Sequence, residues 1–276
     1  MTDVRAYDLS TWNRSVEGEI HRLRLQVDLS WKKEARNLSW FGLQDGMSVL
    51  ELGSGPGFFT KKLLSLVPNS SITAVEIDPT AIEYFQQYLQ GITSDRLKMI
   101  EASIMDTNLP DNSFDFAIVR YVLWNLPDPI GAAKEVLRVL KPGGKCVITD
   151  YDDEFYSLVD PPAPKRLLGF EKLNQFVTAN GGNPKFGRYL WRILKETGFK
   201  KLNLEAVILH SDELGIEPLF KISFDEAFLV PVIQQGFLKE TELEEIRAET
   251  KQFLSSPNAL IMIELLMICG EKPLAT

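Results

Sequence analysis

The organisation of this 276-residue chain is decided by residues 49–60, which read Val49-Leu50-Glu51-Leu52-Gly53-Ser54-Gly55-Pro56-Gly57-Phe58-Phe59-Thr60. A short apolar run is followed by three closely spaced glycines and then by a run with helical spacing. The pattern predicts a strand, a tight turn and a helix, because glycine adopts the backbone angles that such a turn requires. Free N–H groups at the start of the helix would then face any ligand. The stretch fits a ligand-binding turn, and a bare tight turn is the alternative.

Strands and helices alternate after this turn. We expect strands at residues 48–52, 71–77, 97–102, 114–119 and 145–149, and helices at 56–67, 79–90 and 129–140. This alternation is typical of βαβ units, which build a parallel sheet. The strand segments are almost continuously apolar, which indicates that helices cover both faces of the sheet. The central part of the chain is therefore predicted to be an α/β core.

The flanking segments are less regular. Residues 1–45 are polar with helical spacing, and Asp160 to Pro164 form a proline-rich break. Helical patterns follow at 170–178 and 189–197, with strands expected at 202–209 and 259–269. We therefore divide the chain into an N-terminal helical cap (1–45), a core (46–210), a helical lid insertion (211–258) and a last strand that completes the core sheet (259–276).

Composition excludes several classes of protein. The net charge is −8 and the sequence pI about 5.0, so the basic footprint of a nucleic-acid-binding protein is missing. No run of about 18 apolar residues and no signal peptide are recognisable, so we expect a cytoplasmic protein without membrane contact. Cys146 and Cys269 lie in apolar runs and have neither metal-ligand nor disulfide spacing.

A carboxylate follows the second predicted strand. Glu76 stands in the segment Ala74-Val75-Glu76-Ile77-Asp78-Pro79, at the point where that strand ends. An acid about 20 residues beyond a glycine turn accepts hydrogen bonds from ribose hydroxyls in nucleotide-binding folds. A dinucleotide fingerprint would need glycine where Phe58 stands. The spacing therefore favours a nucleoside other than a dinucleotide, and an ordinary solvated acid is the alternative for Glu76.

With these motifs the chain resembles class I, Rossmann-like S-adenosylmethionine-dependent methyltransferases, in their small-molecule subgroup. The segment Gly53 to Gly57 is similar to the first motif of that class. Residues 109–115 are similar to its fourth-strand entry, and residues 136–144 to the helix and turn before its fifth strand. The likeness covers residues 20–150 well. It implies a seven-stranded, mostly parallel sheet with an antiparallel last strand, an N-terminal helical cap and a helical insertion before the last strand.

The resemblance implies S-adenosyl-L-methionine as the cofactor and a set of residues that bind it. At Ser103 the family usually has an acid, and a serine accepts less strongly from an adenine amine. Arg120 would hold the cofactor carboxylate or close a lid, with a structural ion pair as the alternative. Gln26 would bind the same carboxylate, with an exposed glutamine as the alternative. The complete cofactor-binding set is Gly53, Ser54, Gly55, Gly57, Glu76, Ile77, Ser103, Ile104, Arg120 and Gln26.

The sequence does not single out a catalytic group. His21, Tyr7 and Asp150 are candidates, because an imidazole titrates near pH 7 and the other two are placed where a pocket is expected. The alternatives are a surface position for His21, a place in the core for Tyr7 and a solvated turn for Asp150. Aromatic residues can wall an apolar pocket or belong to the core; they are Tyr7, Trp12, Tyr121, Trp124 and Tyr151. The acidic run from Asp150 to Glu154 lacks the Asp-Asn pair of catechol-type sites, so no metal is expected.

The function that these observations favour is methyl transfer to an O, N or C atom of a small organic molecule, such as a specialised metabolite. The loop after the fourth strand, Arg120-Tyr121-Val122-Leu123, lacks the motifs of enzymes that methylate DNA, RNA or protein arginine. Two alternatives stay open: a methyltransferase acting on a peptide or protein, and a non-catalytic cofactor-binding module. A nicotinamide or flavin oxidoreductase is disfavoured by Phe58. The chain is expected to act as a monomer or homodimer.

Overall fold

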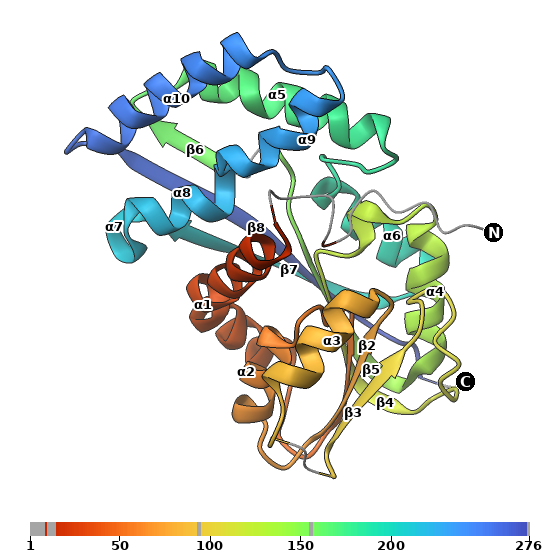
Figure 1. The fold of residues 1–276 in the computed structure, drawn as a ribbon. Helices are drawn as coiled ribbons and strands as arrows, with labels where there is room; N and C mark the ends of the chain where they lie inside the picture. The colour runs from red at the N-terminus through yellow and green to blue at the C-terminus, as the bar shows by residue number, and fades with distance from the viewer. Residues whose placement is uncertain (1–8, 10–14, 93–94, 155–156, 275–276) are drawn as a thin grey trace.

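A computed structural model describes Leu9 and residues 15–92, 95–154 and 157–274. Its centre is a mostly parallel sheet of the predicted Rossmann-like kind (Figure 1). Five strands run parallel in the order β3-β2-β1-β4-β5; they are β1 (Ser48–Leu52), β2 (Ser71–Glu76), β3 (Leu97–Glu101), β4 (Phe114–Arg120) and β5 (Leu140–Asp150). The carboxyl ends of β1, β2 and β4 therefore meet at one edge of the sheet, where such folds bind ligands.

The other end of the sheet is antiparallel and contains a strand that the sequence did not reveal. β8 (Leu260–Glu271) pairs antiparallel with β5 through residues 266–271 and with β6 (Ser157–Asp160) through residues 260–263. β7 (Lys200–His210) pairs antiparallel with β8 along its other edge. The prediction of seven strands is thus corrected to eight. β6 escaped prediction because it is four residues long and adjoins the break Asp160-Pro161-Pro162.

Helices cover both faces of the sheet. α4 (Pro129–Val139) and α6 (Leu190–Thr197) pack on one face; α1 (Val16–Phe41), α2 (Phe58–Leu66), α3 (Pro79–Tyr88) and α8 (Ile216–Phe224) lie on the other. Strand residues alternate between the faces: Leu50 and Leu52 join the α4 side, and Val49 the α2 side. Among the described helices, none combines the length and the apolar character needed to cross a lipid bilayer.

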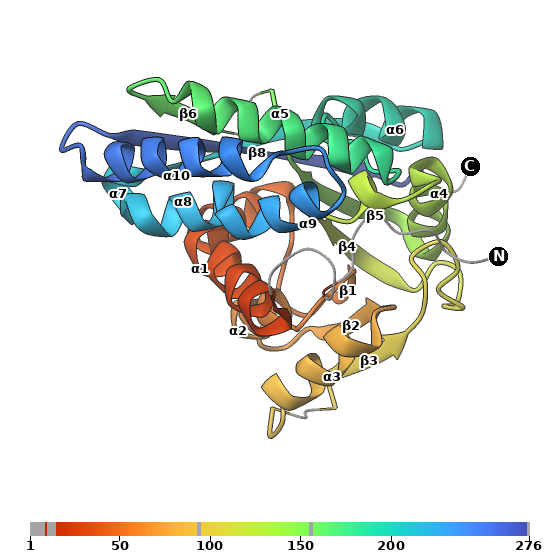
Figure 2. The same ribbon diagram turned by 45° about the horizontal axis from the view of Figure 1, so that its top comes forward.

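A helical layer lies against the antiparallel end of the sheet. It is built from α5 (Pro164–Ala179), α7 (Ser211–Leu214), α8, η3 (Glu226–Phe228), α9 (Leu229–Gln234) and α10 (Glu240–Ser255). In Figure 2, α5 and α10 run alongside each other near β8, with α8 and α9 next to α10, and α5 contacts both α9 and α10. Most of this layer comes from residues 211–255, which the sequence predicted as a helical insertion before the last strand. Two 3-10 turns, η1 (Leu123–Asn125) and η2 (Gly187–Tyr189), complete the described elements.

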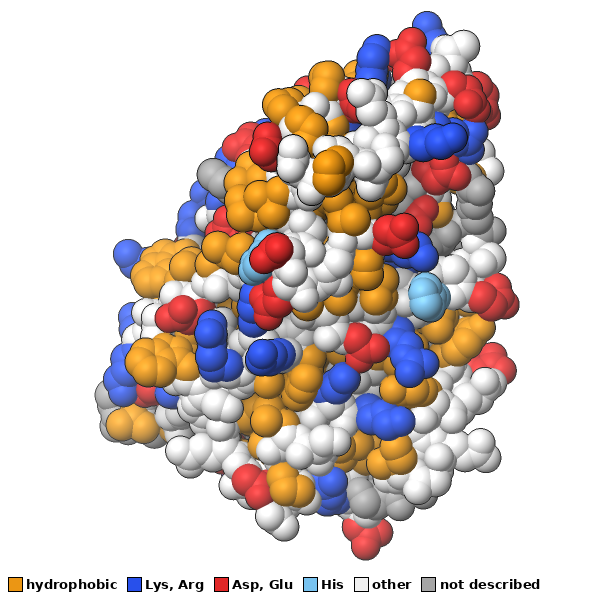
Figure 3. Space-filling view, turned by 90° about the vertical axis from the view of Figure 1, so that its left-hand side faces the viewer, with side chains coloured by type: hydrophobic (Ala, Val, Ile, Leu, Met, Phe, Trp, Pro, Cys, Tyr) orange, Lys and Arg blue, Asp and Glu red, His pale blue; other side chains and the backbone are white. Residues whose placement is uncertain are grey.

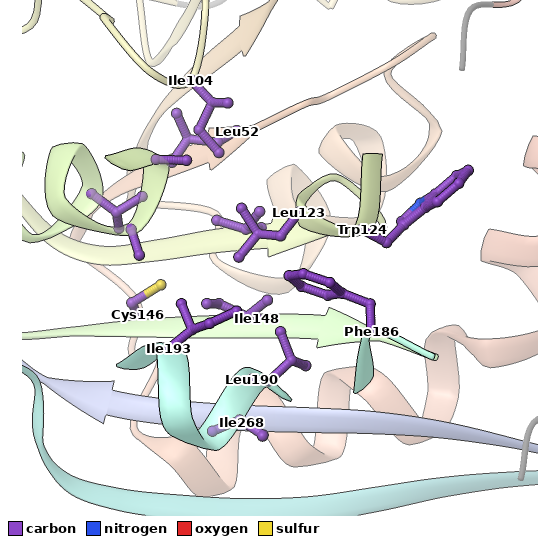
Figure 4. Close-up of a cluster of buried hydrophobic side chains, with 14 of the residues drawn as sticks. Leu52, Ile104, Leu123, Trp124, Cys146, Ile148, Phe186, Leu190, Ile193 and Ile268 are labelled. Carbon is purple, nitrogen blue, oxygen red and sulfur yellow. The ribbon is translucent and has the colours of Figure 1, made fainter. Parts of the chain in front are cut away.

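The surface carries many charged side chains, whereas the interior is apolar. The face that includes α7 and α8 shows basic and acidic side chains interspersed with hydrophobic ones (Figure 3). The interior between the sheet and α6 is apolar: Cys146 and Ile148 of β5 meet Leu190 and Ile193 of α6 (Figure 4). Both cysteines are buried free thiols, and burial raises the pKa of Cys146 well above its usual value.

Candidate functional site

A cavity of about 280 Å³ opens at the carboxyl ends of β1, β2 and β4. One half is lined by the glycine turn, by the end of β2 and by the segment after β3. The other half is lined by α1, α5, α8, η3 and the segment after β5. The cavity therefore lies between the parallel sheet and the helical layer, where a ligand from one half can meet a ligand from the other.

The three glycines of the turn serve different purposes. All adopt left-handed φ angles, 69° at Gly53, 54° at Gly55 and 84° at Gly57. A Cβ at Gly53 would lie 2.3 Å from Val122 Cγ2, and one at Gly57 would lie 2.7 Å from the Phe85 ring. At Gly55 no described atom lies within 4 Å of that position. Gly53 and Gly55 line the cavity, whereas Gly57, predicted to bind the cofactor, lies outside its lining and allows α2 to pack against α3.

Glu76 is tied to the glycine turn. Its Oε2 accepts a hydrogen bond of 2.8 Å from the Gly55 N–H, and its Oε1 accepts from Ile77 N–H at 2.8 Å and Asp78 N–H at 3.0 Å. Asp78 in turn caps α3 by accepting from Thr80 N–H at 2.8 Å, as its position before a proline suggests. Since a carboxylate offers about four acceptor sites, Glu76 retains capacity for ligand hydroxyls.

The residues predicted after β3 reach the cavity as well. Ser103 and Ile104 both line it, beside Ala102. The Ser103 hydroxyl accepts a hydrogen bond of 3.2 Å from the Met105 N–H, which fixes this turn. Ser54 and Ile77 are part of the same lining. Apart from Gly57, the structure thus brings the residues predicted to follow β1, β2 and β3 together at one half of the cavity.

Arg120 forms an ion pair and also lines the cavity. Its Nε donates to Glu34 Oε2 at 2.9 Å and its Nη2 donates to Glu34 Oε1 at 2.9 Å and to Ser30 Oγ at 3.1 Å. The Glu34 side chain is fully buried. The structural ion pair left open by the sequence is therefore present. Among the described residues, Nη1 of Arg120 has no hydrogen-bond partner, so the guanidinium keeps donors for a ligand.

α1 carries a polar stripe into the protein interior. Glu19, Gln26, Ser30 and Glu34 are all buried, at helical spacing along one face. Glu19 accepts two hydrogen bonds from Arg22, at 2.9 and 2.6 Å. Gln26 lines the cavity, so the alternative of an exposed glutamine is wrong. The helical spacing of these polar residues was the sign in the sequence that one face of α1 points into a site. The same pattern is typical of a helix face exposed to solvent, so it did not predict burial.

The two catalytic candidates that the structure describes, His21 and Asp150, do not line the cavity. His21 is exposed on α1, in a shallow groove with Tyr84 and Tyr88, and does not line the cavity. Asp150 is buried beneath the site, where burial raises its pKa to about 8, and it is not part of the lining. Tyr7, like Trp12, lies outside the described residues. Of the predicted wall, Tyr121, Trp124 and Tyr151 do line the cavity.

The cavity also contains carboxylates that sequence reasoning overlooked. Glu51 of β1 is buried, accepts a hydrogen bond of 2.6 Å from Thr60 Oγ1, and has its pKa raised by burial to about 8. Asp153 follows β5 and accepts a hydrogen bond from the Asn174 side chain of α5. Burial and the neighbouring Asp152 raise the pKa of Asp153 to about 7. Glu51 could have been noticed in the sequence, because it is a single carboxylate within the apolar run of residues 49–52.

The predicted acidic run after β5 is structured. Asp152 accepts hydrogen bonds of 2.6 and 2.7 Å from Nε and Nη2 of Arg188, so it belongs to an ion pair and not to a solvated turn. Glu154 pairs with Lys185 and Arg188. Within the described ranges, no group of three or more His, Cys, Asp or Glu side chains is arranged to hold a metal ion.

Comparison with known proteins agrees with this geometry. Residues 50–148 match the methyltransferase domain family. The ubiquinone/menaquinone biosynthesis C-methyltransferase of Hahella chejuensis is 31% identical over 147 residues, covering 52% of this chain and 55% of that protein. The chain thus spans about half the length of the curated relatives it matches.

Solved structures share the fold. A phosphoethanolamine N-methyltransferase from Haemonchus contortus superposes with a TM-score of 0.58 at 18% identity, covering 88% of this chain and 53% of that one. A SAM-dependent methyltransferase from Aquifex aeolicus does so with a TM-score of 0.52 at 20% identity, covering 72% and 90%. The solved structures thus show a shared fold, and within it residues 50–148 match the methyltransferase domain family.

Proposed function

We propose that the protein transfers a methyl group from S-adenosyl-L-methionine to a small organic molecule. The observation that carries the proposal is the hydrogen bond between Gly55 and Glu76 at the cavity wall. The Gly55 N–H donates to the Glu76 carboxylate, both residues line the cavity, and the space beside Gly55 is open. A nucleoside can approach the backbone of this turn closely, because glycine has no side chain. Its ribose hydroxyls can then donate hydrogen bonds to the Glu76 carboxylate.

The residues around the cavity fit the different parts of this cofactor. Glu76 would hold the ribose, Ser103 and Ile104 the adenine, and Arg120 with Gln26 the carboxylate of the methionine end. When bound, the cofactor supplies a methyl group already activated on a sulfonium. The remaining task of the chain is to bind and orient the acceptor and to exclude water, and good alignment alone contributes several kcal/mol.

We call the half of the cavity next to α1, α5, α8, η3 and the segment after β5 the acceptor half. Its lining supports a small, largely apolar substrate. Its walls include Trp124, Phe170, Leu173, Val177 and Phe228. The lining cations are Arg22 and Arg120, and carboxylates of α1 already neutralise both. Arg22 is paired with Glu19, and the remaining donors of Arg120 are assigned to the cofactor carboxylate, so no described lining cation is left for a phosphate. We therefore propose an acceptor without a phosphate. The curated relatives, whose names place them in ubiquinone and menaquinone biosynthesis, also support a small-molecule acceptor.

Calorimetry with two matched glycine variants tests the proposal. The wild type should bind S-adenosyl-L-methionine and its demethylated product. Gly55→Val should abolish that binding, because the new side chain occupies the space next to the turn. Gly46→Val is the control: Gly46 also has a left-handed φ, 89°, and a Cβ there would have no described atom within 4 Å, but it is exposed and outside the cavity. A wild type that binds neither nucleoside would refute the proposal.

Turnover distinguishes an enzyme from a binding module. Methyl transfer from isotopically labelled cofactor should appear on small organic acceptors. Nucleoside binding without transfer to any small molecule, followed by transfer to peptides or proteins, would favour the alternative of a macromolecular substrate. Size-exclusion chromatography with light scattering decides between the monomer and the homodimer that we propose as the possible states.

A further inference from the structure

One wall of the acceptor half comes from a single face of α5. Phe170, Leu173, Asn174 and Val177 stand at spacings of three and four residues and all line the cavity. Three of the four are apolar, and Asn174 is the one amide. Its hydrogen-bond partner in the cavity is Asp153. A polar pair is thus placed in an otherwise apolar and aromatic wall.

The segment that carries Asp153 is held firmly in place. The Asp153 N–H donates to the Pro184 carbonyl at 3.0 Å, and the Gly187 N–H donates to the Tyr151 carbonyl at 2.8 Å. The Asp152–Arg188 ion pair described above joins the same two segments. This double attachment fixes the Asp153 carboxylate with respect to α5, which is the pre-organisation that a binding group needs.

Asp153 differs from the other carboxylates of the cavity. Glu19 is paired with Arg22, Glu76 accepts from three backbone N–H groups, and Asp78 caps α3. Glu51 has the Thr60 hydroxyl as its partner. Within the described part of the chain, Asp153 has no cation within ion-pair distance, because Arg188 is bound to Asp152 and Glu154, and Lys185 to Glu154. Its carboxylate is therefore in no ion pair among the described residues, and the charge of Lys185 acts on it only from a greater distance.

A second acceptor lies beside it. Asn174 Oδ1 is buried and has no hydrogen-bond partner among the described residues. Buried polar atoms in native proteins are nearly always satisfied, so an unmatched acceptor in a cavity wall indicates a ligand donor. Two neighbouring acceptors require a group with at least two N–H or O–H donors. An amine meets this requirement, whereas a single hydroxyl donates only one hydrogen bond.

We propose that Asp153 and Asn174 form an amine-binding subsite, so that the substrate is an apolar molecule bearing a primary or secondary amine. The inference rests on the proposed methyl transfer and makes nitrogen the acceptor atom. Asp153 and Asn174 Oδ1 each accept one N–H of the ammonium group. Rings that line the cavity, among them Trp124 and Phe170, add the attraction of aromatic faces for cations.

Asp153 is the catalytic residue of this subsite, and Asn174 positions it. An ammonium ion has no free electron pair and must lose a proton before its nitrogen can bond to carbon. One N–H bond breaks, its electron pair stays on nitrogen, and the proton bonds to the Asp153 carboxylate. The proton leaves to water when the product departs. The pKa of Asp153, raised by burial and by Asp152 to about 7, suits such an exchange near neutral pH.

Titration with a matched pair of ligands tests the inference. The probes are 2-phenylethylamine and 2-phenylethanol, measured by calorimetry at pH 8 with saturating S-adenosylhomocysteine. The wild type should bind the amine about tenfold or more tightly than the alcohol, as expected for hydrogen bonds to a charged group. Asp153→Asn should bring the ratio close to one, and Asn174→Leu should reduce it. Glu171→Gln removes an exposed carboxylate of α5 that does not line the cavity, and it should leave the ratio unchanged.

The pH dependence provides a second measurement that does not rely on the variants folding. Asp150, Asp152, Glu154, Lys185 and Arg188 are the charged groups around Asp153, and α5 presents the neutral Asn174. Amine affinity of the wild type should rise between pH 6 and pH 8 as Asp153 ionises. Equal binding of the two probes, tighter binding of the alcohol, or no binding of either overturns the inference. If the wild type still binds S-adenosylhomocysteine in those titrations, only the amine inference is overturned and the proposed function stands. If the wild type does not bind S-adenosylhomocysteine, the proposed function is overturned as well.

Discussion

Arg120 of β4 and Glu34 of α1 are joined by two hydrogen bonds of 2.9 Å, with the Glu34 carboxylate fully buried. The contact links the sheet to the long N-terminal helix and holds the guanidinium at the cavity wall. The Arg120 side chain also lies against the rings of Tyr121, at 4.5 Å, and Phe59, at 5.3 Å. A single ion pair thus ties together the fold and the site.

Removing the acid of this pair should destabilise the protein strongly. Glu34→Ala leaves the Arg120 charge buried without its partner, which costs about 3–5 kcal/mol in comparable cases. Asp28→Ala, on the same helix, removes an exposed carboxylate that pairs with Lys62 and should cost below about 1 kcal/mol. Urea unfolding of the two variants measures the difference. Equal stabilities would show that the pair contributes nothing to the fold.

Loss of the Glu76 carboxylate should weaken nucleoside binding without unfolding the protein. Glu76→Ala is expected to cost about 1.5–3 kcal/mol of binding free energy for S-adenosylhomocysteine, the range for hydrogen bonds to a charged group. Glu101 pairs with Glu76 in the sheet register but is exposed and outside the cavity, so Glu101→Ala is the control. Calorimetry gives both affinities, and identical values would remove Glu76 from the binding site.

The first two glycines of the turn should respond differently to alanine. Both variants place a side chain at a left-handed φ, which costs about 1–2 kcal/mol. Gly53→Ala adds a clash with Val122, whose Cγ2 lies 2.3 Å from the new atom, so it should be the less stable of the two. In Gly55→Ala the new Cβ would have no described atom within 4 Å. Shortening Val122 to alanine should rescue stability in Gly53→Ala and have no such effect in Gly55→Ala.

The stability of the protein should fall as the pH rises from about 4 to 8. Burial raises the pKa of Asp150 to about 8, and an unfolded aspartate titrates near 3.9. Between these values the folded state binds more protons than the unfolded state, so raising the pH favours unfolding by up to about 1.4 kcal/mol per pH unit. Asp150→Asn keeps an acceptor for the Tyr151 N–H and should make this dependence less steep. The contributions of Glu51 and Asp153, whose pKa values are also raised, to about 8 and about 7, should remain. Thermal or urea unfolding across this pH range measures it, with the exposed Asp106→Asn as a control that keeps the wild-type slope.

The sequence predicted the half of the site that depends on local patterns. The glycine turn, Glu76 and the parallel order of strands follow from residue type and spacing within short segments. Ser103 and Arg120 could be placed because they end predicted strands. The acceptor half could not be predicted in this way. Asp153 and Asn174 meet only through packing of the helical layer on β8, and a short strand such as β6 has too few residues to show a period.

The buried polar stripe of α1 was misleading for a physical reason. Residues such as Glu19 and Glu34 recur at helical spacing, and carboxylates on one helix face ordinarily contact water. Here arginines meet both of them, Arg22 from the same helix and Arg120 from β4. The partner of Glu34 stands 86 positions away in sequence. No local pattern records such a pairing, so burial of this face became visible only in three dimensions.

The position of β8 between β5 and β7 has a consequence for how the chain assembles. Its twelve residues come after all the other described strands in the sequence, and three of those strands depend on them for an antiparallel neighbour. Until β8 arrives, β5 presents an open edge that invites pairing with other chains. A chain that lacks β8 should therefore be prone to aggregation, because β5, β6 and β7 would each lose an antiparallel neighbour.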